Sequence, residues 1–425
     1  MSDAAIGRGT FARYALFGSA IAFAGPPIYI HAPKFYADIH GMDIAVIGAT
    51  LLAVRAIDFV QDPLIGTLVE KFSQARRTIA IFFALALGTG VSLLFAASTP
   101  FSPQAQLIIA SIIVFTGFSG LQILFYSTGV GIGRANYGNH AQVSAWRETG
   151  ILAGVCAASA APSLIGGDLA SSYGTYAMLF VAYLAIAVIL MRNVWPLGGS
   201  FPQDGRGFLY LFRDGQLRKI FAIGLLNTLP IGVTSTLFLF YVSDRLAAPD
   251  MAGVLLLVFF LSAGLAAPLW ARAASRFGMR RSLMAGMALS ILIFAIAIPL
   301  GVGDGVKFAI ISAASGAALS ADLTLMPAIL SSRLQAIDAG AGKAFGVWGF
   351  LTKASLAIAA GVVLPMLAFA GYAPGEGNSQ DALFALSLGY AGFPCLLKVF
   401  ALGALYLARN IDAVPVATHA QSPTG

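Results

Sequence analysis

Two aspartates and an arginine lie close together in the stretch LLAVRAIDFVQDPLIG, which is otherwise mostly apolar. Asp58 and Asp62 are four residues apart and would share one face of a helix, with Arg55 three residues before Asp58 on the same side. Two carboxylates on one face repel each other unless a cation, a proton or an arginine lies between them. The pair is therefore a candidate site for a coupling ion, either a proton or a sodium ion for which both aspartates would be ligands. The alternative is a charge network in which Arg55 or Lys353 forms a structural salt bridge with them.

Further charged residues fall inside apolar stretches, where a charge near the bilayer centre costs about 2.5–3.5 kcal/mol. Such residues are expected to face a cavity or to pair with one another. Arg147 and Lys353 are expected to neutralise the two aspartates or to hold a polar solute. Glu148 is expected to form an ion pair, and Asp322 to belong to a charge network. Lys398 has no partner that the sequence indicates.

Aromatic and amide side chains within the expected spans are candidates for lining a solute cavity. Sugar sites use flat aromatic faces for stacking and polar groups for the hydroxyls, whereas most aromatic residues in helices only pack. Tyr29 and Asn227 are two further candidates of this kind. The predicted solute-binding set is Gln122, Tyr126, Arg147, Trp348 and Lys353.

The elements that must position these residues follow from the composition. The chain of 425 residues is 58% hydrophobic and only 10% charged, against roughly 25% charged residues in soluble domains. A membrane span needs about 20 apolar residues, and backbone groups in lipid must be satisfied within the segment, so each apolar segment is predicted to be a helix. About twelve such segments fall at 12–31, 44–69, 78–98, 106–132, 143–166, 173–191, 219–243, 251–271, 282–301, 306–331, 344–370 and 384–408.

The placement of lysine and arginine predicts the orientation, because cytoplasmic loops carry an excess of both. With the N-terminus in the cytoplasm, the outer loops hold only Lys34, Arg245 and Lys307, and nearly all other loop lysines and arginines are cytoplasmic. An odd number of spans would remove this asymmetry. Both termini are therefore predicted to face the cytoplasm.

The chain divides into two similar halves. Its longest polar stretch, 192–218, is rich in Gly, Pro and charge, as a linker should be, and it separates six spans from six. The second span ends in Pro63 and Lys71-Phe72, and the eighth ends with the same spacing in Pro268 and Arg276-Phe277. Parallel six-helix repeats are typical of major facilitator transporters. The predicted organisation is an N-terminal half 1–191, a cytoplasmic linker 192–218, a C-terminal half 219–410 and a cytoplasmic tail 411–425.

Enzymatic and ATP-driven functions find no support in the sequence, which has no Walker motif, zinc-ligand spacing or nucleophile elbow. The two cysteines, Cys156 and Cys395, lie in apolar runs and form no metal or disulfide pattern. The net charge of +7 lies mainly in the cytoplasmic loops, so no nucleic-acid partner is predicted. The expected partners are a small-molecule solute and the lipid bilayer, with a monomeric chain and no cofactor besides the coupling ion.

The second-span run VRAIDFVQDPLIG resembles the corresponding motif of the glycoside–pentoside–hexuronide:cation symporters, a major facilitator family whose type member is melibiose permease. The eleventh span, AFGVWGFLTKASLAIAAGVVLPMLAFAGY, is also similar to that family. The resemblance implies that Asp58 and Asp62 are the acids of the cation site. It implies a solute contact for Arg147, a place at the junction of the solute and cation sites for Lys353, and a stacking role for Tyr126.

The sequence also departs from that family. Gln122 stands where the family has an acid that serves both sugar and cation, and Ala22 stands where it has a sugar-binding aspartate. Trp348-Gly349 replaces a Gln-Thr pair. The cation half of the site is thus retained without one acid, which favours sodium less than the complete set would, and the sugar half does not match a galactoside site.

These features together predict an all-α membrane protein with twelve transmembrane helices in two pseudo-symmetric six-helix halves, the major facilitator fold, in a bacterial inner membrane. The predicted function is symport of a small polar solute, a sugar or glycoside, coupled to Na⁺ or H⁺ through alternating access. The alternative is an amphiphilic or lipid-like solute, which would need a laterally open, apolar cavity. The charges expected to latch the halves when the inner side is closed, or else only to mark the cytoplasmic side, are Glu70, Lys71, Arg76 and Arg77.

Overall fold

The computed structural model describes residues 7–25, 32–96, 98–165, 169–199, 208–373, 375, 377–409 and 411–412, and these contain helices and no strand. The candidate Tyr29, residues 200–207 of the predicted linker and residues 413–425 of the predicted tail lie outside the described residues. The first helices are α1 (Arg8–Ala22), α2 (Ala32–Asp38), α3 (Ile44–Lys71), α4 (Arg76–Leu94), α5 (Pro103–Ala135), α6 (His140–Ile165) and α7 (Leu169–Leu190). They are followed by α8 (Gly215–Phe240), α9 (Ala252–Phe277), α10 (Met279–Ala297), α11 (Gly305–Ala336), α12 (Ala341–Phe369), α13 (Gln380–Ser387) and α14 (Phe393–Leu407).

Nine helical segments of the described chain are long and apolar enough to cross a bilayer. They contain α4, α5, α7 to α12, and a last segment in which a π-helical turn at Leu388–Gly392 joins α13 to α14. The remaining three predicted spans correspond to α1, α3 and α6, of which α3 carries Arg55, Asp58 and Asp62 near its middle. The predicted all-helical fold is confirmed for the described residues, and each predicted span overlaps a helix, although residues 26–31 of the first predicted span lie outside the described residues.

Large apolar side chains cover the outer faces of these helices. Leu85 of α4, Leu179 of α7, Leu265 of α9 and Leu292 of α10 are each more than half exposed. A contiguous apolar surface of this kind is unfavourable in water and is matched by the hydrocarbon of a bilayer. The outward-facing leucines therefore identify the faces that contact lipid.

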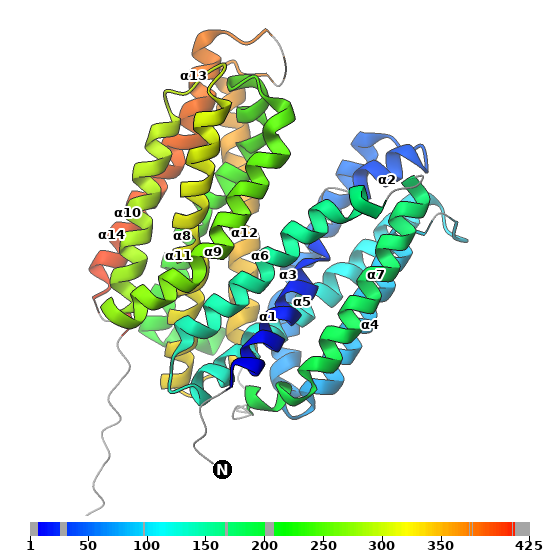
Figure 1. The fold of residues 1–425 in the computed structure, drawn as a ribbon, viewed down its shortest axis with the longest axis vertical. Helices are drawn as coiled ribbons and strands as arrows, with labels where there is room; N and C mark the ends of the chain where they lie inside the picture. The colour runs from blue at the N-terminus through cyan, green and yellow to red at the C-terminus, as the bar shows by residue number, and fades with distance from the viewer. Residues whose placement is uncertain are drawn as a thin grey trace, which may run out of the picture.

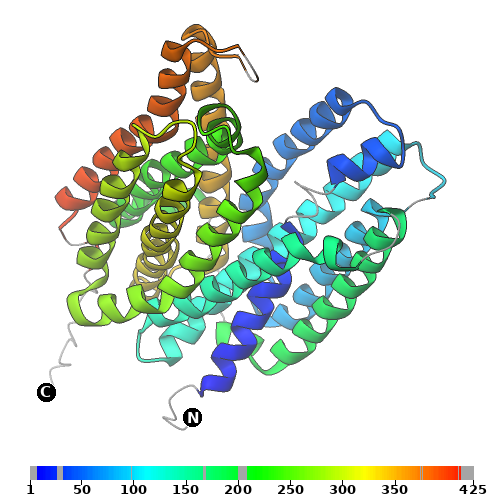
Figure 2. The same cartoon turned by 45° about the horizontal axis from the view of Figure 1, so that its top comes forward.

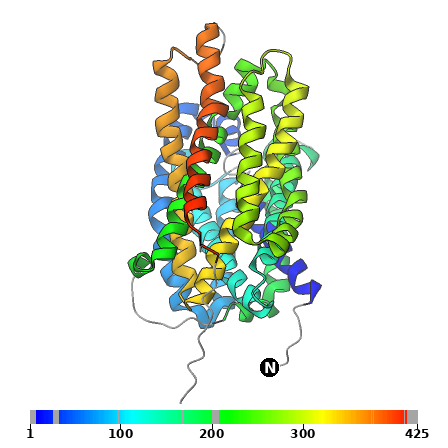
Figure 3. The same ribbon diagram turned by 90° about the vertical axis from the view of Figure 1, so that its left-hand side faces the viewer.

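The helices form two groups, which Figure 1 shows side by side: α1 to α7 make the N-terminal half, and α8 to α14 make the C-terminal half. Figure 3 views the C-terminal half from its outer side, where its helices run along the long axis of the molecule. The halves meet at the end where α1 begins and α14 ends, and they diverge toward the end that carries α2 and α13 (Figures 1 and 2). We call these the closed end and the open end.

Two helix pairs form the most extensive packing between the halves, since α3 packs along α12 and α6 packs along α9. Glycines allow α3 and α12 to approach closely. A Cβ atom on Gly66 would lie 2.5 Å from the carbonyl oxygen of Gly342, and one on Gly346 would lie 2.6 Å from the carbonyl oxygen of Asp62. Real Cβ atoms do not come this near to backbone oxygens, so a larger residue at either position would push the helices apart. The close packing places Asp62 directly against α12.

Candidate functional site

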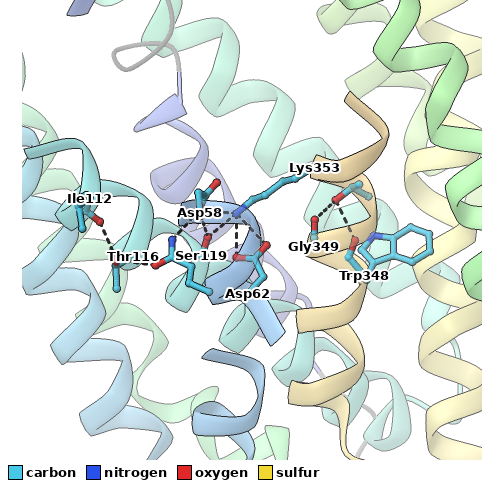
Figure 4. Close-up of polar contacts among 10 residues, drawn as sticks. Asp58, Asp62, Ile112, Thr116, Ser119, Trp348, Gly349 and Lys353 are labelled. Carbon is cyan, nitrogen blue, oxygen red and sulfur yellow. Dashed lines mark hydrogen bonds and ion pairs between the residues drawn. The ribbon is translucent and has the colours of Figure 1, made fainter. Parts of the chain in front are cut away.

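Asp58 and Asp62 of the N-terminal half both form ion pairs with Lys353, which belongs to α12 of the C-terminal half (Figure 4). The Lys353 Nζ atom lies 2.8 Å from Asp58 Oδ1 and 2.9 Å from Asp62 Oδ2. It also donates a hydrogen bond of 2.8 Å to Ser119 Oγ of α5, which in turn donates to Asp58 Oδ1 over 3.2 Å. We call these four residues the inter-half cluster.

The inter-half cluster is buried and unbalanced in charge. Asp58 and Asp62 are 4% and 1% exposed, whereas the Lys353 side chain is 17% exposed. One ammonium faces two carboxylates, so the four residues carry one excess negative charge when both acids are ionised. Because an uncompensated buried charge is costly, a proton or a cation would stabilise the cluster. Arg55, the alternative partner expected from the sequence, is half-buried on the same helix.

Two neighbours fix the aspartates in place. Gln61 Nε2 donates to Asp58 Oδ1 over 2.8 Å, and Thr116 Oγ1 of α5 donates to Gln61 Oε1 over 2.9 Å (Figure 4). A Cβ atom on Gly349 would lie 2.7 Å from Asp62 Oδ2, so the missing side chain makes room for this carboxylate. Gly349, which departs from the family pattern, thus leaves space for the Asp62 carboxylate in the position that this structure shows.

Sequence reasoning did not single out Ser119, Gln61 or Thr116 as members of this site. Each is an ordinary polar residue within a long apolar span, and the only signal available was that polarity. Within the described part of the chain, no group of three or more His, Cys, Asp or Glu is arranged to hold a metal ion. A sodium ion at Asp58 and Asp62 would therefore need hydroxyl or amide oxygens in addition to the two carboxylates.

A cavity of about 140 Å³ lies between the halves, next to the inter-half cluster, and its lining includes Gly349 and Thr352, which precede Lys353 on α12 by four residues and by one residue. Of the predicted solute-binding residues, Gln122, Tyr126 and Trp348 line this central cavity. Its remaining lining among the described residues is Ile123, Glu148, Asn227, Thr228, Ile231, Asp322, Leu323, Met326, Pro327 and Phe345.

Arg147 lies behind this lining. Its Nε atom pairs with Glu148 Oε1 over 2.8 Å, and its guanidinium lies 4.0 Å from the centre of the Tyr126 ring. Arg147 is 1% exposed, and its ion pair is with Glu148 and not with Asp58 or Asp62. The expectation that Arg147 neutralises the two aspartates is therefore wrong, because Glu148 is its immediate neighbour, and the ion pair predicted for Glu148 is confirmed.

Asp322 and Lys398 form a second buried ion pair, which the sequence did not indicate. Lys398 Nζ of α14 lies 2.5 Å from Asp322 Oδ2 of α11 and donates to Asn227 Oδ1 of α8 over 2.7 Å. All three residues are at most 4% exposed, and all belong to the C-terminal half. We call them the C-half cluster. The assignment of Asp322 to a charge network agrees with this geometry, in which Lys398 is its partner.

The C-half cluster lies between two cavities. Asp322 and Asn227 line the central cavity, whereas Lys398 lines a cavity of about 260 Å³ within the C-terminal half. Ile231 and Leu323 line both cavities, so the two adjoin. The wall of this C-half cavity is strongly apolar and includes Phe238, Phe259, Phe260, Phe294 and Phe308.

Polar contacts join the halves at the closed end. Glu70 of α3 forms a buried ion pair with Lys343 of α12, in which Nζ and Oε1 are 2.8 Å apart. Arg134, at the end of α5, pairs with Asp338 over 2.9 Å, and both side chains are about half exposed. Glu70 therefore bridges the halves as the sequence predicted.

Arg76 has a different role from the one expected. It donates to Ser127 Oγ over 3.0 Å, to Thr128 Oγ1 over 3.3 Å and to the carbonyl oxygen of Gly199 over 3.1 Å. These partners lie on α5 and just after Trp195–Gly198, the second of two short helices that follow α7, so Arg76 stabilises the N-terminal half and does not latch it to the other half. The reason is its burial beneath Gly198, away from the interface of the halves.

His140, at the start of α6, is a titratable group in the interface at the closed end. Its Nε2 atom lies 2.5 Å from Gln335 Oε1 of α11, and the residue is 2% exposed. Burial lowers the pKa of His140; the hydrogen bond with Gln335 opposes this shift, and the positive charge of Arg134 adds to it. The neutral imidazole is thus the form that suits the closed end.

Comparison with solved structures identifies the fold. The chain is similar to a bacterial homologue of the iron transporter ferroportin in an outward-facing state, with 14% identity and a TM-score of 0.68, over 92% of this chain and 99% of that one. It is similar to the E. coli fucose:proton symporter, with 14% identity and a TM-score of 0.63 over 93% and 98% of the two chains. The human organic anion transporter TETRAN gives 16% identity and a TM-score of 0.63, again over 93% and 98%. No curated protein matches the sequence closely.

Two six-helix halves around a central cavity define a transporter of the major facilitator fold, which these neighbours share and which the sequence predicted. The sequence over residues 13–412 matches the family described as MFS/sugar transport protein, and the chain belongs to that family. It is accordingly a multi-pass membrane protein and a transporter, not an enzyme.

Proposed function

We propose that the protein couples the movement of a cation, Na⁺ or H⁺, to the symport of a small polar solute, a sugar or glycoside. The observation that carries this proposal is the ion pairing of Asp58 and Asp62 of one half to Lys353 of the other half, beside a cavity between the halves. The family description names sugar transport, and one structural neighbour is a fucose:proton symporter. Both support a sugar as the solute.

Coupling follows from the charge of the inter-half cluster. A proton on Asp58 or Asp62, or a sodium ion between them, weakens the attraction that both acids exert on the Lys353 ammonium. The coupling ion and the ammonium thus compete for the same oxygens. Because the acids and the lysine lie on different halves, this competition changes the free energy of bringing the halves together at this level, which links ion binding to the transport cycle.

The central cavity supplies the groups that a polar solute needs. Gln122, Asn227, Thr228 and Thr352 offer amide and hydroxyl groups, and Trp348 offers a flat aromatic ring. A few convergent polar groups among apolar walls are typical of small-molecule sites. Lys353, one residue from Thr352, is placed to transmit solute binding to the inter-half cluster.

We place the closed end in the cytoplasm of a bacterial cell, because the loops rich in lysine and arginine lie at that end, and we assign the chain to the inner membrane as a monomer. The structure then corresponds to an outward-open state, and rocking of the halves would close the outer end and open the inner one. The contacts of Glu70 with Lys343 and of Arg134 with Asp338 would break in that step.

A second candidate function, transport of an amphiphile, is favoured by one observation. The C-half cavity is larger than the central cavity, is walled by phenylalanines, and adjoins the central cavity at Ile231 and Leu323. A solute with a polar head and an apolar tail would fit the two cavities together.

The experiment uses the purified protein in liposomes with an imposed Na⁺ or pH gradient and a panel of radiolabelled sugars. Accumulation of a sugar in response to one gradient, and not to the other, supports the proposal and identifies the ion. If no sugar moves under either gradient while a single-chain amphiphile is transported, the second candidate replaces the first.

A further inference from the structure

The central cavity is lined by two carboxylates on opposite sides. Glu148 belongs to α6 of the N-terminal half, and Asp322 belongs to α11 of the C-terminal half. Three aromatic residues, Tyr126, Phe345 and Trp348, share the lining, and the ring centres of Tyr126 and Phe345 are 5.1 Å apart. The cavity thus combines acids with aromatic faces.

The cationic partners of both acids lie behind them. Arg147 pairs with Glu148 over 2.8 Å, and Lys398 pairs with Asp322 over 2.5 Å. In the part of the chain that the structure describes, neither Arg147 nor Lys398 lines the central cavity; Lys398 faces the C-half cavity instead. Each ion pair therefore presents its negative end to the central cavity. A positive charge placed there is attracted by the near carboxylate more strongly than it is repelled by the more distant cation.

Asp322 has a free acceptor atom. Its Oδ2 atom takes the Lys398 ammonium, but no described residue donates a hydrogen bond to its Oδ1 atom, and the residue is 4% exposed. A buried acceptor without a donor is unfavourable, so a donor from a bound molecule would stabilise it. Asp322 lines the central cavity, so a molecule bound there is the source of a donor that this inference invokes.

The geometry points to a solute that carries an ammonium group, which binds in the central cavity between Asp322 and the aromatic faces of Phe345 and Trp348. Cations are attracted to aromatic faces, most strongly to that of tryptophan. The Arg147 guanidinium already lies over the Tyr126 ring, so Phe345 and Trp348 are the rings assigned to the ammonium. This inference rests on the proposed transport function and specifies its solute class, for instance an amino sugar in place of a neutral sugar.

Two matched pairs of probes test the charge directly. One pair is glucosamine and glucose, and the other is choline and its uncharged isostere with carbon in place of the ammonium nitrogen. Binding of each probe to the purified full-length protein in nanodiscs is measured by isothermal titration calorimetry. We expect the charged member of at least one pair to bind about tenfold more tightly than the neutral member. The inference would be overturned if, in both pairs, the charged member bound no more tightly than the neutral member, or if neither charged member bound.

A variant then assigns the preference to Asp322. The double substitution Asp322→Asn, Lys398→Met removes the acid without leaving a buried lysine unpaired, and it is expected to abolish the preference for the charged probe. The matched control is Asp304→Asn, Lys307→Met, which removes an ion pair of 2.7 Å whose lysine is exposed, outside the cavity, and should leave the preference unchanged. If the double variant Asp322→Asn, Lys398→Met still prefers the charged probe, the assignment of that preference to Asp322 is wrong. If that variant does not fold, the inference is tested by measuring the binding of the probe pairs to the wild type and to the Glu148→Gln variant.

Transport measurements separate this inference from the proposed function. If neutral sugars accumulate under an ion gradient while charged probes do not bind, coupled transport stands and the ammonium site is wrong. If charged probes bind with the expected preference but no probe accumulates under any gradient, the ammonium site stands and coupled symport is wrong.

Discussion

The inter-half cluster and the C-half cluster use the same chemistry, a lysine ammonium held by buried carboxylates, but their lysines come from different places. Lys353 reaches Asp58 and Asp62 from the opposite half of the molecule. Lys398 reaches Asp322 within one half. The first contact must respond when the halves move relative to each other, whereas the second can survive such a movement intact.

The two clusters also differ in their balance of charge. In the C-half cluster one lysine meets one aspartate and an amide oxygen, so the charges cancel. In the inter-half cluster one lysine meets two aspartates, so one proton or cation is still needed to reach neutrality. A site that is both unbalanced and shared between moving bodies can couple an ion to a conformational change, and a balanced site within one body serves to stabilise that body or to bind a ligand.

The largest expected effect concerns the stability of the C-terminal half. Asp322→Asn leaves the Lys398 ammonium buried without a counter-charge, and we expect it to lower the free energy of unfolding by about 3–5 kcal/mol. The double variant Asp322→Asn, Lys398→Met should recover most of that loss, because no charge remains unpaired. Unfolding in detergent, followed by tryptophan fluorescence, measures both. A double variant as unstable as the single one would show that the ion pair is not the source of the loss.

The next effect tests whether an ion pair between the halves controls conformation. Glu70→Gln removes the carboxylate that neutralises Lys343 while the closed end is closed, so it should shift the equilibrium toward opening of that end by about 2 kcal/mol or more. Spin labels at Tyr137 and Ser275, in a background without the native cysteines, report the distance between the halves. The control Asp338→Asn breaks an exposed pair and should shift the equilibrium by less than about 1 kcal/mol. Equal shifts in the two variants would contradict the role of burial.

A third prediction addresses coupling at the inter-half cluster. With an imposed gradient of about one pH unit, one coupled proton supports about tenfold accumulation, since a factor of ten corresponds to about 1.4 kcal/mol. Asp62→Asn balances the cluster permanently, with Lys353 on Asp58 alone, and should reduce accumulation in liposomes to simple equilibration. The variant Asp322→Asn, Lys398→Met should keep the accumulation ratio of a neutral solute. If both variants lost the accumulation ratio, the view that only the inter-half cluster couples the ion to the solute would be wrong.

The smallest effect is the response of the closed end to pH. Because burial holds the pKa of His140 below its ordinary value of 6.5, the closed state favours the neutral imidazole. The closed end should keep its full stability above that value and lose stability as the pH falls toward the lowered pKa. The same spin-label distance measures this shift, and His140→Gln, which keeps an amide donor for Gln335, should remove the pH dependence. A pH response that persists in this variant would assign it to another group.

Most of the fold could be predicted from the sequence, because long apolar segments in lipid have no alternative to the helix. The span boundaries, the division into halves and the charged residues in α3 all follow from the pattern of residues. The repeat also indicated where the halves differ, since Ala263 and Ala267 occupy the positions equivalent to Asp58 and Asp62.

The pairing of the buried charges could be predicted only in part. Asp58 and Asp62 were recognised from their spacing, and Lys353 was one of several possible partners. The partner of Lys398 was not recognised, because Lys398 and Asp322 lie on different helices whose rotation about their own axes the sequence leaves undetermined. In the sequence, Ser119 and Asn227 could be recognised only as polar residues within apolar spans.

The sequence by itself determined which segments cross the membrane and which charges must be compensated, since both depend on the free energy of transferring individual groups into lipid. Only the tertiary structure decided which cation compensates which acid, and whether that cation belongs to the same half. That choice depends on distances between helices far apart in the chain, and these are set by close packing at positions such as Gly346 and Gly349.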